Sequence, residues 1–159
     1  MAFDRRELDE LMHHGIRYAY SLTHDQTEAE DLLQDAWLNL IRYDGPRDRL
    51  YFIKVIRNRF LERLRKRQPN FTPLHLANEG DFETESDVEF PEALDWSGLH
   101  GALAELRPEE REAVYLNVVE EYTAAEIADI TGRSRGTVLS LLFRTKKKLR
   151  AMLSAQEAS

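Results

Sequence analysis

The chain has 159 residues, of which 42% are hydrophobic and 32% are charged, a composition typical of one ordinary domain or two very small ones. The absence of cysteine excludes a disulfide framework and thiolate metal sites. The N-terminus lacks the apolar core of a signal peptide, and no apolar run approaches membrane-spanning length. We therefore expect a cytoplasmic protein with no membrane insertion.

The formal net charge of −7 is unevenly distributed. Residues 1–67 carry 13 basic and 12 acidic side chains, and residues 99–159 carry 9 of each. Residues 68–98 carry 8 acidic side chains and no lysine or arginine. Since the net acidity lies in this middle segment, local clusters are a better guide to nucleic-acid binding than the overall charge.

The first third of the chain predicts three helices. Apolar residues between Leu8 and Ala19 repeat at the i, i+3, i+4, i+7 spacing of one helix face. A second helix is predicted to begin at a capping box, Thr27–Glu30, and to carry an apolar stripe over residues 29–40. Asp44-Gly45-Pro46 breaks that helix, and a third is predicted over residues 49–67. Three such stripes can bury a small shared core.

An acidic segment follows Gln68-Pro69, and we expect it to be a flexible linker over residues 69–96. It is rich in aspartate and glutamate and holds several prolines. Such a segment cannot bury enough apolar surface to offset the entropy lost on ordering.

The second unit, residues 97–159, is predicted to contain a helix-turn-helix. Thr123–Glu126 is a capping box, Gly132 suits the position after a helix end, and Ser134 suits the N-cap of the last helix. A short helix, a glycine turn and a capped basic helix are typical of proteins that enter the DNA major groove.

The last predicted helix is strongly basic. From Arg133 to Arg150 there are seven basic residues and no acidic one, which favours contact with DNA phosphates. Its predicted core face comprises Val138, Leu142, Thr145 and Leu149. The alternative is a basic surface helix that is merely solvated.

A second basic tract runs from Lys54 to Arg67 and is opposed only by Glu62. Aromatic residues lie in and beside it, which suits a single strand whose unstacked bases rest on rings. Tyr51 and Asn58 are the best candidates for base contact. The phenylalanines of the tract are expected to be core.

The helix over residues 28–42 has a face that mixes acids, amides and large apolar groups. This mixture favours binding to another protein, and a solvated helix face is the alternative.

No catalytic pattern is visible. The five histidines, His13 and His14 among them, do not have metal-ligand spacing, and there is no phosphate-binding glycine loop or nucleophile elbow. We expect no enzyme activity, no metal, no cofactor and no small-molecule substrate.

Over residues 10–67 and 99–153 the motifs together resemble the extracytoplasmic-function (ECF, group 4) sigma factors, small two-domain members of the sigma-70 family. Asp31-Leu-Leu-Gln-Asp-Ala-Trp37 resembles the pattern that binds the clamp helices of the polymerase largest subunit. Tyr51–Asn58 with the basic run that follows resembles the segment that reads and melts the −10 element, and Leu106–Arg111 resembles the start of the −35 reader.

The resemblance implies an all-α fold with two small helical domains, an N-terminal bundle like sigma region 2 over residues 1–68 and a helix-turn-helix like region 4 over residues 97–159. It implies a sigma factor that directs promoter-specific transcription initiation, is stress-responsive and is controlled by an anti-sigma protein. The implied partners are core RNA polymerase, promoter DNA and that anti-sigma protein.

The resemblance assigns site residues to three surfaces. Core polymerase is expected to contact Asp31, Leu32, Gln34, Asp35, Trp37 and Leu38. The −10 DNA is expected to contact Tyr51, Lys54, Arg57, Asn58, Arg59, Arg63, Arg65, Lys66 and Arg67. The −35 DNA is expected to contact Arg133, Ser134, Arg135, Thr137, Ser140, Phe143, Arg144 and Lys147.

The chain departs from the family pattern at Leu139 and Leu141, where basic, groove-facing residues are usual, and at Tyr51, where tryptophan is usual. We expect the leucines, with Phe143, to contact an anti-sigma protein, because apolar groups on a DNA-facing helix suit a protein partner. An alternative function is a sigma-like mimic that sequesters an anti-sigma protein without binding promoters. A conventional repressor would need a ligand-binding or dimerisation domain, and residues 1–67 carry neither signature.

Overall fold

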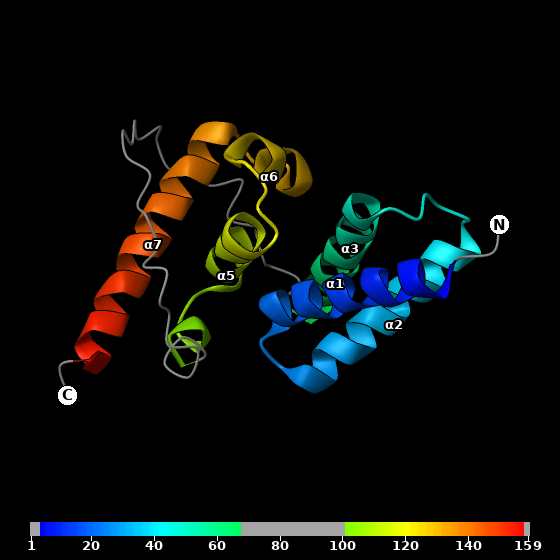
Figure 1. The fold of residues 1–159 in the computed structure, drawn as a ribbon, viewed down its shortest axis with the longest axis horizontal. Coiled ribbons are helices and arrows are strands. Elements are labelled where there is room, and N and C mark those ends of the chain that lie inside the picture. Colours follow the sequence, from blue (N-terminus) through cyan, green and yellow to red (C-terminus); the bar gives the residue numbers. More distant parts are fainter. Residues whose placement is uncertain (1–3, 68–100, 158–159) are drawn as a thin grey trace. The chain divides into compact units, whose positions relative to one another are not determined.

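The computed structural model describes residues 4–67 and 101–157, which fall into two compact units (Figure 1). The described residues are helices and their connections, without a strand, which confirms the predicted all-α class. The predicted linker, residues 69–96, lies outside the described residues. None of the described helices is both long and apolar enough to span a bilayer.

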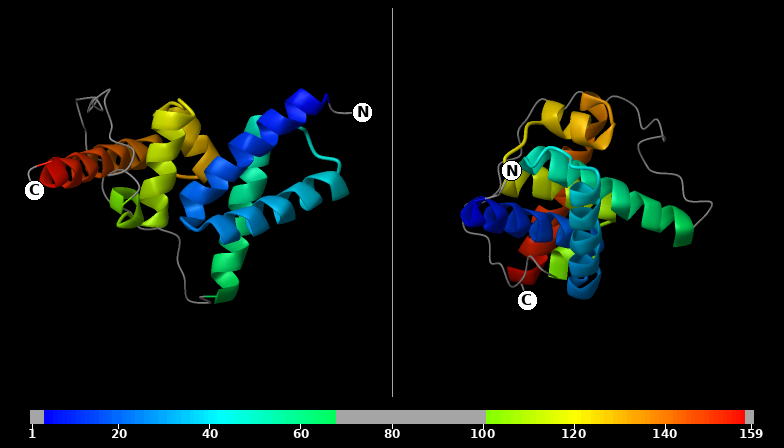
Figure 2. Two further views of the ribbon diagram at one scale, coloured as in Figure 1. Left: turned by 60° about the horizontal axis from the view of Figure 1, so that its bottom comes forward. Right: turned by 90° about the vertical axis from the view of Figure 1, so that its right-hand side faces the viewer.

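The first unit is a bundle of three helices, α1 (Arg5–Thr23), α2 (Gln26–Arg42) and α3 (Arg49–Arg67), each in contact with the other two (Figure 2). The bounds of α3 are those predicted from the sequence.

The start of α2 differs from the prediction. Asp25, in an extended conformation, is the N-cap, and its Oδ1 accepts a hydrogen bond from the backbone N–H of Glu28 at 2.9 Å. Thr27 therefore lies inside the helix, and the predicted capping box at Thr27–Glu30 is wrong. Aspartate is at least as good an N-cap as threonine, so both positions carried a start signal.

The core of the first unit is made by the apolar stripes of its three helices. Its largest fully buried side chains are Tyr18, Leu32, Leu40, Phe52, Ile53 and Ile56. Gly15 lets α1 approach closely, since a Cβ there would lie 2.6 Å from Phe52 Cε1 and 2.7 Å from Leu33 Cδ1. The lack of a side chain at Gly15 thus fixes how tightly the three helices pack.

The second unit contains α5 (Pro108–Val114), a π-helical turn η2 (Tyr115–Val119), α6 (Ala124–Thr131) and α7 (Arg135–Glu157). Both α5 and α6 pack on α7. The π-helical turn was not predicted from the sequence.

The predicted helix-turn-helix signals are confirmed. Thr123 Oγ1 accepts from the backbone N–H of Glu126 at 3.2 Å, and the backbone N–H of Thr123 donates to Glu126 Oε1 at 3.1 Å. Gly132 ends α6 in the left-handed region at φ 74°, which favours glycine. Ser134 Oγ accepts from the backbone N–H of Thr137 at 3.1 Å and caps α7.

Candidate nucleic-acid and polymerase interfaces

The α2 surface predicted to bind core polymerase is mostly accessible. Leu38 is 58% exposed, so its side chain is accessible to a partner. Trp37 is half-buried, and its ring meets Phe52 edge to face with centroids 6.2 Å apart, so α3 holds the indole in place. Leu32 is fully buried, and its assignment to this surface is wrong because it belongs to the core stripe.

One exposed apolar residue, Ile41, extends this surface and was not among the contacts predicted from the sequence. Ile41 follows Leu38 by three positions and so shares its face of α2. Tyr43 lies just beyond the helix, with the Arg42 guanidinium 5.7 Å from its ring centroid. The i+3 spacing was a usable signal for Ile41.

The basic helix α3 presents its polar residues on two faces, because successive residues of an α-helix are rotated by about 100°. Tyr51, Asn58 and Arg65 lie on one outward face and are exposed. Lys54 shares that face and is half-buried. The Tyr51 ring lies over the turn at Gly45, where a Cβ would be 2.6 Å from Tyr51 Cε1. The residues predicted to contact bases therefore share one outward surface.

A second row of α3 faces α2. Arg59 Nε and an Arg63 terminal nitrogen lie 3.9 Å and 3.7 Å from Asp35 Oδ2. Arg67 lies 3.2 Å from Glu28 Oε1. The structure thus pairs residues predicted for −10 DNA with Asp35, a residue predicted for the polymerase.

The structure does not support the predicted contact of Arg57 with −10 DNA. It is only 7% exposed, so in this structure it presents little surface to a phosphate. All the cations of the tract were predicted to face outward, but a continuous helix turns some of its residues inward.

In α7 the outward surface carries Arg135, Arg144 and Lys147, which are exposed, and Leu139 and Phe143, which are half-buried. Leu139, Phe143 and Lys147 follow each other at i+4 and form one row along the helix. This row is an accessible strip along the outward side of α7.

The predicted core face of α7 is confirmed, and it is wider than predicted. Leu141, 2% exposed, is buried alongside Val138 and Thr145, and Ser140 is also buried. The predictions that Leu141 contacts an anti-sigma protein and that Ser140 reads the groove are therefore wrong. Leu141 lies three residues after Val138 and four before Thr145, which places it on the packed face.

The structure also does not support the predicted contact of Arg133 with −35 DNA. Its side chain is 4% exposed and lies 3.6 Å from Glu112 Oε1, whose side chain is 3% exposed. This buried ion pair ties the turn before α7 to α5. Arg133 therefore supports the helix-turn-helix from within instead of contacting DNA.

Ser134 and Thr137 are engaged in the cap of α7, with their hydroxyl oxygens 2.8 Å apart. Two lysines of α7 are used inside the unit: Lys146 Nζ donates to Asn117 Oδ1 at 2.7 Å, and Lys148 Nζ to Glu110 Oε1 at 3.4 Å. These two lysines thus hold α7 against the preceding helical segments of the second unit.

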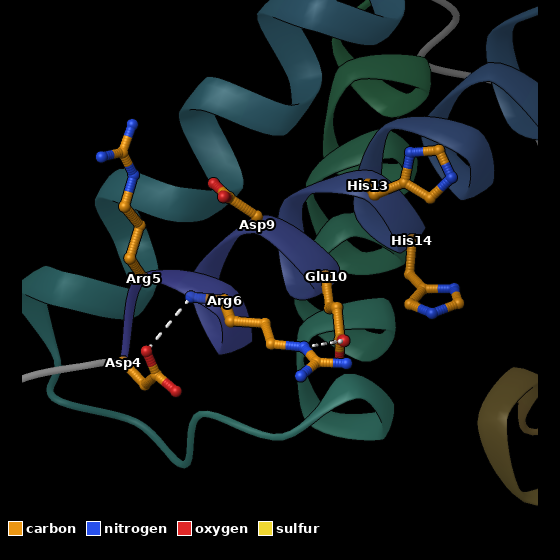
Figure 3. Close-up of a pocket in the computed structure, with 7 residues that line it drawn as sticks. All are labelled: Asp4, Arg5, Arg6, Asp9, Glu10, His13 and His14. Carbon is orange, nitrogen blue, oxygen red and sulfur yellow. Dashed lines mark hydrogen bonds and ion pairs between the residues drawn. The ribbon is translucent and has the colours of Figure 1, made fainter.

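A surface hollow at the N-terminal end of α1 brings no predicted site residues together (Figure 3). Its lining residues are Asp4, Arg5, Arg6, Asp9, Glu10, His13 and His14. Arg6 Nε lies 3.5 Å from Glu10 Oε1, and both side chains are largely exposed, so this pair adds little stability. In the described ranges no three potential metal ligands are grouped.

Two family models match the chain, sigma-70 region 2 over residues 9–69 and sigma-70 region 4 over residues 98–149. The ECF RNA polymerase sigma factor SigM of Bacillus subtilis is 29% identical over 150 residues, covering 89% of this chain and 89% of the relative. The RNA polymerase sigma-E factor of Streptomyces avermitilis is 30% identical over 147 residues, covering 89% of this chain and 80% of the relative.

Among solved structures, the sigma factor RpoE from Bartonella quintana, in complex with the anti-sigma factor NepR, is similar with a TM-score of 0.70. The match covers 94% of this chain and 96% of that one at 24% identity. At this identity the likeness establishes a shared fold.

Proposed function

The chain belongs to the extracytoplasmic-function group of the sigma-70 family, and on that premise we propose how its surfaces divide the work of directing RNA polymerase to promoters. Residues 1–68 are assigned to polymerase binding and the −10 element, and residues 97–159 to the −35 element. The polymerase supplies the phosphoryl-transfer chemistry, so the chain acts as an initiation factor and not as an enzyme. Its proposed place of action is the cytoplasm.

Core polymerase is assigned to the α2 surface. The observation that carries this assignment is the exposure of Leu38 beside the half-buried Trp37, in a helix whose other large apolar groups are mostly in the core. Asp31 and Gln34, both exposed, supply the polar rim. An apolar centre with a polar rim is the usual anatomy of a protein interface.

The −10 element is assigned to the outward face of α3. Tyr51 offers a ring on which a base can stack, and Asn58 offers an amide that can hydrogen-bond to a base edge. Lys54 and Arg65 flank them with positive charge. Capture of an unstacked base would offset the few kcal/mol that unpairing costs, at roughly the scale of base flipping.

The −35 element is assigned to the outward face of α7. Arg135, Arg144 and Lys147 supply charge for phosphates or guanine, and Phe143 supplies apolar contact. Leu139, in the same row, replaces a cation usual in the family. We propose that this apolar pair also serves an anti-sigma protein, which would compete with DNA for α7.

The first experiment mixes the chain with core polymerase and fragmented genomic DNA from its source, and maps transcript 5′ ends. Discrete starts that share two upstream elements are expected. Failure to direct any start while polymerase still binds would contradict the assignment of promoter recognition to this chain.

Matched variants test the individual surfaces. Leu38→Asp is expected to abolish core binding, whereas Leu50→Asp, at another exposed leucine, leaves it intact. Lys147→Gln is expected to weaken −35 binding, and its neighbour Lys148→Gln is not, because Lys148 is tied to Glu110. Equal effects within either pair would contradict the surface concerned.

A further inference from the structure

We propose that Asn117 is a positioning residue for −35 recognition, although it lies outside the surface of α7 assigned to DNA. Its amide bridges the entry of α6 and the flank of α7, and so fixes how far α7 is rolled about its own axis. The roll decides how the outward side chains of α7 meet the groove. This inference rests on the assignment of α7 to the −35 element and adds what sets the sequence selectivity of that contact.

The side chain of Asn117 makes two contacts that join separate parts of the second unit. Its Nδ2 donates to the backbone carbonyl of Tyr122 at 3.0 Å, one residue before the N-cap of α6. Its Oδ1 accepts from Lys146 Nζ in α7 at 2.7 Å. A carbonyl oxygen can only accept and an ammonium group can only donate, so the two partners fix the orientation of the amide. Neither leucine nor aspartate, which are of similar size, can make both contacts.

The backbone around Asn117 is shaped to form this bridge. Asn117 lies in η2, a π-helical turn, whose backbone hydrogen bonds span five residues instead of four. Glu121 then adopts a φ of 60°, in the left-handed region that is uncommon for residues other than glycine. The chain reverses there, and the backbone N–H of Tyr122 donates back to the Leu116 carbonyl at 2.9 Å. The reversal brings the Tyr122 carbonyl to the amide of Asn117.

Lys146 is placed where its contact controls the roll of α7. With about 100° between successive residues, Lys146 lies roughly 80° around the helix from the packed face centred on Val138. Lys147, on the outward side, lies opposite that face. Lys146 is therefore on the flank of α7, and a contact there opposes rotation of the helix. The apolar packing beneath α7 is not directional and constrains rotation less.

A small roll is enough to alter recognition of bases. An α-helix with its side chains is about 10–12 Å across, so a roll of about 10° displaces an outward side chain by about 1 Å. Hydrogen bonds to base edges occupy a narrower range, about 2.7–3.2 Å between nitrogen and oxygen. Lysine contacts with phosphates tolerate more displacement, because the ammonium is a point charge on a flexible stem. Loss of the bridge should therefore reduce selectivity for the −35 element more than it reduces non-specific binding.

The contact on the opposite flank of α7 is weaker. Lys148 Nζ lies 3.4 Å from Glu110 Oε1, and the side chain of Lys148 is 45% exposed. A longer and more solvated contact constrains the helix less. Lys148 is thus a matched control for Lys146, since it carries the same charge on the same helix without the short contact to Asn117.

Asn117→Leu in the full chain removes the bridge without changing charge. Fluorescence anisotropy measures binding to a duplex that carries the upstream element shared by the mapped transcript starts, and to a duplex in which that element is scrambled. The ratio of the two affinities is expected to fall about three- to tenfold, the scale of one lost hydrogen bond. The salt dependence of binding is expected to stay at the wild-type value, because no phosphate contact is lost.

Substitutions of Lys146 test the other end of the bridge. Lys146→Met is expected to lower the affinity ratio as much as Asn117→Leu, with the same salt dependence as wild type. Lys146→Arg keeps a donor and is expected to retain the wild-type ratio. The double variant of Asn117→Leu with Lys146→Met should lose no more than the larger single loss, because both substitutions remove one contact. Circular dichroism checks folding, and if Asn117→Leu does not fold, Lys146→Met against Lys146→Arg decides.

Two neighbouring lysines separate roll from direct contact with DNA. Lys148→Gln is expected to keep the wild-type ratio. Lys147→Gln is expected to weaken binding to both duplexes alike and to lower the salt slope by about one phosphate contact.

Three results would overturn the proposal. The first is a wild-type ratio in both Asn117→Leu and Lys146→Met. The second is a fall in the salt slope of Lys146→Met like that of Lys147→Gln, since Lys146 would then contact DNA itself. The third is full additivity in the double variant. Failure of the proposed function is seen separately, because the wild-type chain would then bind both duplexes equally.

Discussion

Leu139 and Leu141 are separated by one residue on α7, yet they have opposite environments. Leu139 is half-buried in the outward row with Phe143 and Lys147, whereas Leu141 is packed with Val138. Of the two departures from the family pattern on α7, only Leu139 therefore alters the surface that we propose for the −35 groove. At Leu141 the apolar residue serves the core.

Leu139→Lys is expected to tighten binding to a −35 duplex several-fold and to weaken capture by an anti-sigma protein. The added cation can reach a phosphate or guanine, and a good base contact is worth about 1–3 kcal/mol. Fluorescence anisotropy across a salt series measures the effect, with a steeper salt dependence expected. Unchanged binding to both partners would show that Leu139 contacts neither.

The matched control is Leu141→Ala, at the buried leucine of the same helix. This substitution is expected to lower the free energy of unfolding by about 2–5 kcal/mol through the cavity it leaves. Thermal and urea unfolding followed by circular dichroism measure it. A stability equal to wild type would contradict the burial of Leu141.

The buried pair of Arg133 and Glu112 gives a second prediction for single residues. Arg133→Ala leaves the Glu112 carboxylate buried without this partner, and losing one member of such a pair costs about 3–5 kcal/mol. Urea unfolding provides the measurement. Arg135→Ala, at an exposed position two residues later, is expected to change stability by at most about 0.5 kcal/mol. Similar losses for both variants would show that burial of the pair is not what stabilises the turn.

At the scale of whole elements, the close approach of α1 to its neighbours depends on Gly15. Gly15→Ala is expected to destabilise the first unit by about 1–3 kcal/mol, because the new Cβ would overlap Phe52 and Leu33. Thermal unfolding measures the loss, and core polymerase binding should weaken with it. Gly101→Ala is the control, since a Cβ there meets nothing within 4 Å. If Gly15→Ala unfolds at the wild-type temperature, the three helices can readjust freely.

Helices and caps were largely predictable because their signals are local. The bounds of α3, the capping box at Thr123, and the glycine turn at Gly132 depend on residues within one or two turns of each other. The exception at the start of α2 is local as well: Asp25 and Thr27 are both acceptable N-caps, and sequence alone did not rank them.

The exposure of charged residues was less predictable because it depends on other helices. Arg57 and Arg133 lie in basic tracts whose composition predicts DNA binding, yet both are buried in the structure. The pairing of Asp35 with Arg59 and Arg63 required the antiparallel placement of α2 against α3. These pairings arise from tertiary packing, and no spacing within one helix indicates them.

In the molecule as a whole, the net negative charge is concentrated in one segment of the chain. The acids that make the protein acidic lie in residues 68–98, between two units whose charges nearly balance. Because it lies on the same chain, this acidic segment is expected to compete with phosphates for the two surfaces proposed to bind DNA, at high effective concentration. The overall charge is thus set by a segment to which none of the assigned contacts belongs.

Neutralising four of these acids tests whether their charge matters. Asp81→Asn, Glu83→Gln, Glu85→Gln and Asp87→Asn together remove four negative charges from a net charge of −7. We expect the free chain to bind DNA more tightly, and the holoenzyme to change its ratio of abortive to full-length transcripts, because a polyanion can occupy the basic path that nascent RNA follows. Filter binding and gel analysis of transcripts measure the two effects.

The matched control keeps the charge and changes only side-chain length, with Asp81→Glu, Glu83→Asp, Glu85→Asp and Asp87→Glu. It is expected to match wild type in both measurements, since electrostatic competition depends on charge far more than on one methylene. If neutral and charge-preserving variants alter binding and transcripts equally, the specific side chains matter and their charge does not. If neither alters them, the partition of charge serves properties other than DNA binding or initiation.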